Sequence, residues 1–146
     1  MQNINQSQIV PYPQKSMFEL VDDVDRYQDF LPWCGGSKVL EQTDSTVTAS
    51  VSIAFKGLHK SFITRNTLTK YDRISMELVD GPFQELSGEW RFFAIDDHSC
   101  EVTLNLDFEV AGGVLGKIIK PVFLLICESM VKAFCNRADE LYGNGK

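Results

Sequence analysis

Apolar residues recur at every second position in four segments of this chain, which is the pattern of strands with one buried face. The four apolar rows are Val47, Ala49, Val51, Ile53 and Phe55; Ile74, Met76 and Leu78; Leu86, Gly88, Trp90 and Phe92; and Val102, Leu104, Leu106, Phe108 and Val110. Residues 59–68 alternate less regularly, and one face of this segment carries Phe62, Thr64, Asn66 and Leu68. With a short strand at residues 4–10, these segments predict a sheet of about six or seven strands.

Turn-forming residues separate these rows at short intervals. They are Thr43-Asp44-Ser45, Lys56-Gly57, Tyr71-Asp72, Asp80-Gly81-Pro82 and Asp96-Asp97-His98-Ser99. Such short connections favour hairpins between neighbouring strands. The sequence therefore predicts an antiparallel sheet whose strands follow one another in chain order.

Helical periodicity occurs before and after the sheet. Residues 13–21 and 24–30 predict two short helices after the first strand, and the pattern ends before Pro32 and Gly35-Gly36. The longest helical pattern is 114–142, and its apolar stripe holds Leu115, Ile119, Val122, Ile126, Met130, Ala133 and Phe134. Because proline has no N–H group, Pro121 should leave a short turn at 114–120 and start the main helix. One long helix against one curved sheet covers all the apolar rows and makes this an α+β fold.

The composition limits the organisation and the partners of the chain. With 146 residues, 44% of them hydrophobic, we expect one domain over residues 1–146. The formal net charge of -6 opposes a general attraction to nucleic acid. Residues 1–6 have neither the basic nor the apolar region of a secretory signal, so we expect a cytoplasmic protein. The four cysteines form no CxxC pair, which favours reduced, packed thiols over a disulfide framework.

Residue types that carry catalysis are scarce. The chain has two histidines, His59 and His98, and the second lies in a polar turn. Neither a GxSxG turn nor an HExxH helix nor a cluster of metal ligands occurs. We therefore expect no catalytic residues, no metal and no cofactor, and an enzyme acting on aromatic polyketides is a third and weaker interpretation.

The inward rows mix small and bulky residues, which is consistent with a ligand cavity between sheet and helix but also with an ordinary core. The segment 121–127 is apolar on nearly every side, so either loops and early helices cover it or it borders a cavity mouth and touches a membrane. The candidate cavity residues are Val51, Ile53, Phe55, Phe62, Thr64, Asn66, Met76, Leu78, Trp90, Phe92, Leu106, Phe108, Ile119, Phe123, Ile126, Met130 and Arg137.

Three of these candidates are polar and fall where burial is expected: Thr64, Asn66 and Arg137. A buried polar group needs a partner, since an unpaired one costs about 1 to 3 kcal/mol. One interpretation pairs Asn66 and Arg137 with backbone groups or with carboxylates such as Asp107 and Glu109. The other has them orient the polar head of a mostly apolar ligand.

Five blocks in order make the chain resemble a known family. They are Tyr27-Gln28-Asp29-Phe30-Leu31-Pro32-Trp33-Cys34, Phe55-Lys56-Gly57, Phe62-Ile63-Thr64-Arg65-Asn66, Leu78-Val79-Asp80-Gly81-Pro82-Phe83 and Met130-Val131-Lys132-Ala133-Phe134. Together they resemble the coenzyme Q-binding protein family and its bacterial relative, the ribosome association toxin, within the START-like polyketide cyclase/dehydrase superfamily. Ile63 departs from this pattern, because the family often has threonine there.

The resemblance implies a helix-grip fold with a cavity that binds an isoprenoid quinone, most simply ubiquinone, in support of respiration. It also implies an alternative, in which the protein binds the large ribosomal subunit and blocks subunit association as part of a toxin-antitoxin system. Candidate contacts for that surface are Lys56, Lys60, Arg65 and Lys70, although these residues also fit a solvated sheet face. A lipid ligand would further imply transient contact with the inner membrane.

Overall fold

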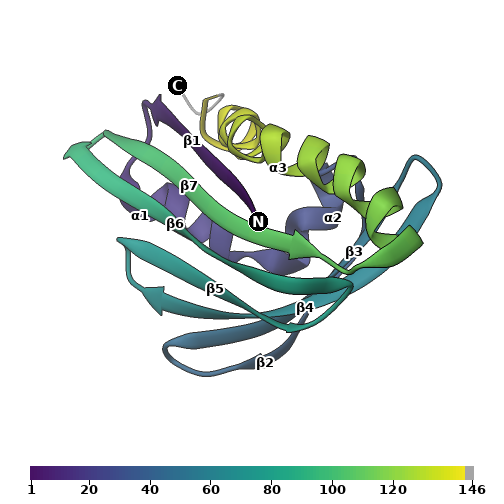
Figure 1. The fold of residues 1–146 in the computed structure, drawn as a ribbon. Helices are drawn as coiled ribbons and strands as arrows, with labels where there is room; N and C mark the ends of the chain where they lie inside the picture. The colour runs from purple at the N-terminus through teal and green to yellow at the C-terminus, as the bar shows by residue number, and fades with distance from the viewer. Residues whose placement is uncertain (144–146) are drawn as a thin grey trace.

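One seven-stranded antiparallel sheet forms the body of the molecule (Figure 1). The computed structural model describes residues 1–143. The strand order is β1-β7-β6-β5-β4-β3-β2, so β2 to β7 each pair with a sequence neighbour and β1 joins the far edge beside β7. The elements are β1 (Gln2–Val10), α1 (Gln14–Asp22), the 3-10 turn η1 (Val24–Arg26), α2 (Tyr27–Phe30), β2 (Cys34–Gln42), β3 (Thr46–Phe55), β4 (Leu58–Thr69), β5 (Arg73–Asp80), β6 (Phe83–Asp96), β7 (Ser99–Val110) and α3 (Gly113–Tyr142).

The apolar rows read from the sequence face the core as expected. In β7, Val102, Leu104, Leu106 and Phe108 are buried while Asn105 between them is exposed. The antiparallel register places Trp90 of β6 beside Leu104 on one side and Ile74 of β5 on the other. The turns between strands lie where the sequence predicted them, which confirms the sequential antiparallel sheet.

Strand β2 was not predicted, because Gly35 and Gly36 were interpreted only as helix breakers. It forms the outer edge of the sheet, and its pairing with β3 shifts in register between Cys34 and Gly36. A side chain at position 35 would place its Cβ 2.8 Å from that of Ala54, so glycine permits this close approach.

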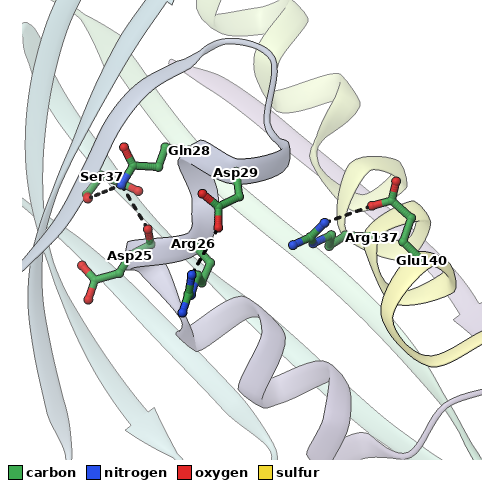
Figure 2. A network of polar contacts seen from close by, with 7 residues as sticks. All are labelled: Asp25, Arg26, Gln28, Asp29, Ser37, Arg137 and Glu140. Atoms are coloured by element: carbon green, nitrogen blue, oxygen red, sulfur yellow. Dashed lines mark hydrogen bonds and ion pairs between the residues drawn. The ribbon is translucent and has the colours of Figure 1, made fainter. Parts of the chain in front are cut away.

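The free edge of β2 is partly covered by η1 and α2. The backbone N–H of Val39 donates to Asp25 Oδ1 at 3.0 Å, and Gln28 Nε2 donates to the carbonyl of Ser37 at 3.4 Å. These contacts satisfy groups that would otherwise offer a template for another strand. They also fix η1 and α2 to the sheet, and Figure 2 shows the bond between Gln28 and Ser37.

Helix α3 runs without interruption from Gly113 to Tyr142, so the predicted turn at 114–120 and the helix start near Pro121 are wrong. The break is avoided because Pro121 and Lys117 are both exposed. The Lys117 carbonyl, which loses its helical N–H donor to the proline, thus belongs to an exposed residue on the solvent side of the helix.

The helix α3 lies along one face of the sheet and next to β1 (Figure 1). Gln6 Nε2 of β1 donates to the carbonyl of Glu128 at 2.9 Å. The buried residues of α3 include Ile119, Phe123, Phe134 and Ala138, which face the apolar rows of the sheet. The four cysteines are free and buried, as expected.

Candidate functional site

A small apolar cavity lies between the sheet and α3. Its volume is about 80 Å³, against the roughly 10 to 15 Å³ needed to hold one water molecule. Its wall is formed by Val24, Tyr27, Trp33, Ala49, Val51, Phe62, Thr64, Asn66, Met76, Leu86, Trp90, Leu104, Leu106, Phe123, Ile126, Cys127 and Met130. The cavity is therefore real but narrow, because large side chains fill most of the space under the helix.

Most of the predicted cavity residues meet at this wall. They are Val51, Phe62, Thr64, Asn66, Met76, Trp90, Leu106, Phe123, Ile126 and Met130. They come from strands β3 to β7 and from one face of α3. In each strand, the alternation of apolar residues correctly predicted which side chains face the helix.

The other candidates do not line the cavity. Ile53, Phe92, Phe108 and Ile119 are buried in solid parts of the core, and Phe55 and Leu78 are half-buried toward the ends of their strands. Phe108 illustrates the difference, since its ring packs 4.7 Å from that of Phe123, centroid to centroid, and leaves no free space. Alternation predicts which face is buried, but it does not show where along a strand the packing is incomplete.

Several lining residues were not among the candidates. Ala49, Leu86 and Leu104 belong to the predicted inward rows, and Cys127 lies beside Ile126 on α3. Val24, Tyr27 and Trp33 come from η1, α2 and the turn before β2, which close one side of the cavity. The periodicity of the sequence does not predict that these residues line the cavity, because their position depends on how the short helices pack against the sheet.

Thr64 and Asn66 form the polar feature of the cavity wall. They lie two residues apart on the inward face of β4, and each is buried with 7% exposure. Thr64 Oγ1 donates to Asn66 Oδ1 at 3.0 Å. The partner of Asn66 is thus a neighbouring hydroxyl and neither of the two carboxylates suggested by the sequence. Of these, Asp107 accepts a hydrogen bond from Asn3, and Glu109 accepts one from the N-terminal amine.

Three further groups in the wall carry a proton that can be lost or donated: the phenol of Tyr27, the thiol of Cys127 and the indole N–H of Trp33. The phenol of Tyr27 donates to the carbonyl of Val21, and burial raises its pKa. Burial also raises the pKa of the Cys127 thiol to about 12. The indole N–H of Trp33 is buried without a hydrogen-bond partner among residues 1–143. At neutral pH these wall residues are therefore uncharged, and the Trp33 N–H is a buried donor that a ligand could use.

Arg137 lies outside the cavity, in an open groove between α2 and α3 (Figure 2). Its guanidinium stacks over the Phe30 ring at 5.2 Å and contacts Glu140 Oε1 at 3.3 Å. Asp29 and Lys132 also line this groove, whose open volume is about 510 Å³. A carboxylate partner for Arg137 was one of the two alternatives, and Glu140 is that partner.

The four basic candidates do not form one patch. Lys56 lies in the β3–β4 turn and Lys70 in the turn at the other end of β4, a strand of 12 residues that spans about 40 Å. Arg65 lies between them, opposite Glu77 of β5. It is five residues from Lys60 on the same strand, so the two side chains point to opposite faces of the sheet. Only Lys56 and Lys60 share one end of the hairpin.

Residues 1–143 contain no group of three or more His, Cys, Asp or Glu side chains placed to hold a metal ion. His59 and His98 are both exposed and lie outside the cavity wall. The site can therefore enclose an apolar group beside a few hydrogen-bonding side chains, and it brings no acid-base pair into the cavity.

Comparison with known proteins places these features in context. The family described as polyketide cyclase / dehydrase and lipid transport matches residues 10–135. The ribosome association toxin RatA of Pseudomonas aeruginosa is 43% identical over 97% of this chain and 98% of its own length. RatA of Escherichia coli (strain K12) is 41% identical over 97% of this chain and 90% of its own.

More distant similarities point to other functions within the same fold. The mitochondrial coenzyme Q-binding protein COQ10 homolog B of Xenopus laevis is 24% identical over 95% of this chain and 59% of its own length. The crystal structure of the ZhuI aromatase/cyclase from a Streptomyces species superimposes with a TM-score of 0.82 at 20% identity, covering 94% of this chain and 93% of its own. At that identity the superposition establishes the fold alone, which is the helix-grip fold expected from the sequence.

Proposed function

Because the chain belongs to the polyketide cyclase / dehydrase and lipid transport family, we propose that its cavity binds a hydrophobic small molecule without converting it. The observation that carries this proposal is an apolar cavity with one polar pair, Thr64 and Asn66, in its wall. Each CH2 equivalent of the ligand that enters the cavity supplies about 0.8 kcal/mol of affinity through its burial. The polar pair favours ligands that carry an oxygen at one end.

We propose that the ligand is not chemically changed, because of the residues that form the cavity wall. Tyr27 and Cys127 are its titratable residues within the described part of the chain, and burial keeps both protonated at neutral pH. General acid-base catalysis needs a group whose pKa lies near the working pH. A wall of this kind binds and shields a ligand but offers no group to exchange a proton with it.

The ligand we propose is an isoprenoid quinone, such as ubiquinone. Similarity to a coenzyme Q-binding protein supports this choice, and a ring carbonyl is the kind of acceptor that the Asn66 amide or the Trp33 indole would take. The cavity volume of about 80 Å³ is below the roughly 150 Å³ of an apolar cavity that takes benzene. The ring must therefore open the cavity, and the isoprenoid tail stays outside it.

The side that opens is the one formed by η1 and α2. These elements contribute Val24 and Tyr27 to the wall, and side-chain bonds from Asp25 and Gln28 hold them to β2. Both elements are short, so few backbone hydrogen bonds resist their displacement. The strands and α3 would keep their places during such an opening.

Tryptophan fluorescence tests ligand binding directly. The chain has two tryptophans, Trp33 and Trp90, and both line the cavity. Titration with a short-chain ubiquinone analogue should quench their emission to saturation. Organic extraction of the natively purified protein followed by mass spectrometry should recover an isoprenoid quinone.

A matched pair of variants separates cavity binding from nonspecific quenching. Ala49→Leu fills part of the cavity, because Ala49 is a wall residue with 1% exposure. Ala94→Leu adds the same atoms at an exposed position of β6. Ala49→Leu should weaken quenching at least tenfold, and Ala94→Leu should leave it unchanged. Absence of quinone in the extract together with equal quenching in both variants would show that no quinone enters the cavity.

A second function, association with the large ribosomal subunit in the cytoplasm, is favoured by similarity over nearly the whole chain to proteins named ribosome association toxin. The β3–β4 hairpin offers Lys56 and Lys60 for contact with ribosomal RNA. Such contacts would weaken as salt displaces them from phosphate groups. This outer surface and the cavity use different residues, so the two functions are compatible.

Co-sedimentation with isolated large subunits tests the second function. We expect the wild-type chain to sediment with the subunits at low salt, and Lys56→Glu/Lys60→Glu to remain in the supernatant. Lys15→Glu/Lys38→Glu changes the net charge equally at exposed positions on α1 and β2 and should sediment like the wild type. If both double variants sedimented alike, the hairpin would not be the contact surface; failure of the wild type to sediment would remove the function itself.

A further inference from the structure

The first half of α3, Gly113–Cys127, carries an apolar stripe on its outer side. Val114, Ile118, Pro121 and Leu125 follow one another at intervals of four, three and four residues, which places them on one helix face. Val114 is 75% exposed, Ile118 52% and Leu125 50%. These four residues are called the outer stripe, and no described element of the chain packs over them.

Positive charge accompanies the outer stripe. Lys117 and Lys120 are exposed, and Gly113–Cys127 contains no acidic residue in a chain with a net charge of -6. Neither lysine forms an ion pair with any residue from 1 to 143. The first acidic residue of α3 is Glu128, beyond the stripe. Apolar side chains flanked by unpaired lysines are typical of helices that lie in the surface of an anionic membrane.

The opposite face of the same half-helix forms part of the cavity wall. Phe123, Ile126 and Cys127 line the cavity, while Leu125 between them points outward. A surface that held the outer stripe would therefore lie one helix diameter, about 10 Å, from the ligand site. None of the described helices is long and apolar enough to cross a bilayer.

We propose that the first half of α3 docks on the surface of a bilayer that contains anionic phospholipids. The outer stripe enters the boundary between head groups and acyl chains, and Lys117 and Lys120 contact the phosphate groups. This site goes beyond the binding of a ligand in the cavity, because it is a separate surface with its own partner. Docking there would hold the cavity close to a bilayer that can supply or receive an apolar ligand, while the ligand itself enters on the side of η1 and α2.

Flotation with lipid vesicles tests the proposal. The full chain should float with vesicles of phosphatidylglycerol and phosphatidylcholine at low salt, and much less with phosphatidylcholine alone. Lys117→Glu/Lys120→Glu should lower the partition coefficient about fivefold or more for each lysine. Ile118→Glu/Leu125→Glu should lower it at least about tenfold, because both apolar contacts are lost. Both pairs are exposed in the free protein, so the variants should fold.

Matched controls keep the result specific. Lys15→Glu/Lys38→Glu alters the same net charge away from α3, and Ile9→Glu/Ile95→Glu alters exposed apolar residues of β1 and β6. Both controls should float like the wild type. Quenching of Trp33 and Trp90 by a quinone analogue should persist in the α3 variants, so that loss of docking is distinguished from loss of ligand binding.

Three outcomes would overturn the proposal. The wild type fails to float with any vesicle, or the α3 variants float as well as the controls. In the third, Ile118→Glu/Leu125→Glu abolishes self-association in size-exclusion chromatography and leaves flotation unchanged, which would assign the outer stripe to a second copy of the chain.

Discussion

The two halves of α3 share one continuous helix but present different outer surfaces. The first half, Gly113–Cys127, exposes the outer stripe and two lysines. The second half, residues 128–142, exposes mainly charged and polar side chains, among them Lys132, Asp139 and Glu140, with Leu141 near its end as an exposed apolar residue. A helix packed on one sheet needs only one apolar face. The second half meets that requirement, while the first half has apolar surface in excess of what folding uses.

Anchoring follows the same division. In the second half, Tyr12 Oη donates to Asp139 Oδ1 at 2.5 Å and Tyr142 Oη to the carbonyl of Ser16 at 3.3 Å, which attaches the helix to the chain around α1. Phe134 packs against the rings of Tyr27, Phe30 and Trp90. The first half contacts the sheet through its inner face only. Both halves therefore pack their inner face on the sheet, the first through rings such as Phe123. The second half is attached in addition to the chain around α1, and the first leaves its outer surface free for a partner.

The largest predicted effect is the loss of the anchor at Phe134. This side chain is fully buried, with ring centroids of Tyr27, Phe30 and Trp90 at 5.2 Å. Phe134→Ala should lower the free energy of unfolding by about 3 to 5 kcal/mol. Urea denaturation followed by circular dichroism measures the loss. An effect below about 1 kcal/mol would show that this cluster does not anchor the helix.

The matched variant in the first half is Leu125→Ala, also in α3 but 50% exposed. Truncation there should change the free energy of unfolding by no more than about 0.5 kcal/mol. A large loss would mean that the outer stripe is covered in the isolated protein, and the contrast between the two halves would disappear.

The sequence predicted the strands well because one-sided burial imposes a period of two that single residues rarely disrupt. Strand β2 was missed because Gly35, Gly36 and a register shift interrupt its alternation at the start. The helix break at Pro121 was wrong for a different reason. Whether a proline breaks a helix depends on whether its ring and the freed carbonyl face solvent, and this follows from tertiary packing.

Replacing Pro121 sharpens the comparison with a smaller effect of opposite sign. Proline is about 3 kcal/mol less favourable than alanine inside a helix, and this difference already includes the greater stiffness of the unfolded chain. Pro121→Ala should therefore raise the free energy of unfolding by up to about 3 kcal/mol. The new N–H can donate to the Lys117 carbonyl, so hydrogen exchange should slow in the first half and stay unchanged in the second. Faster exchange near position 121 would contradict this account.

The cavity shows how far pattern reasoning reaches into a site. Thr64, Asn66 and Trp90 were found because strand parity decides which side chains face the helix. Tyr27 and Trp33 were not found, since their place depends on the docking of η1 and α2 across the sheet. The volume is also set by side-chain packing, which a sequence pattern does not contain.

A further small effect compares one buried thiol in each half. Burial raises the pKa of Cys127 to about 12 and that of Cys135 to about 11, from an ordinary 9.0. Above pH 9 the unfolded thiols lose protons that the folded ones keep, so stability present below pH 9 falls as pH rises toward 11. At pH 10 each thiol should account for about 1 kcal/mol of that loss.

Measurements at pH 7 and pH 10 on Cys127→Ala and Cys135→Ala isolate these contributions, because any cost of truncation is common to both conditions. Each variant should lose about 1 kcal/mol less between the two conditions than the wild type does. A first half that opened readily would let Cys127 ionise near pH 9, and its substitution alone would then have no effect on the pH dependence. Equal effects of the two substitutions would instead mean that the halves are equally closed inside, and that they differ only on the surface they present to a partner.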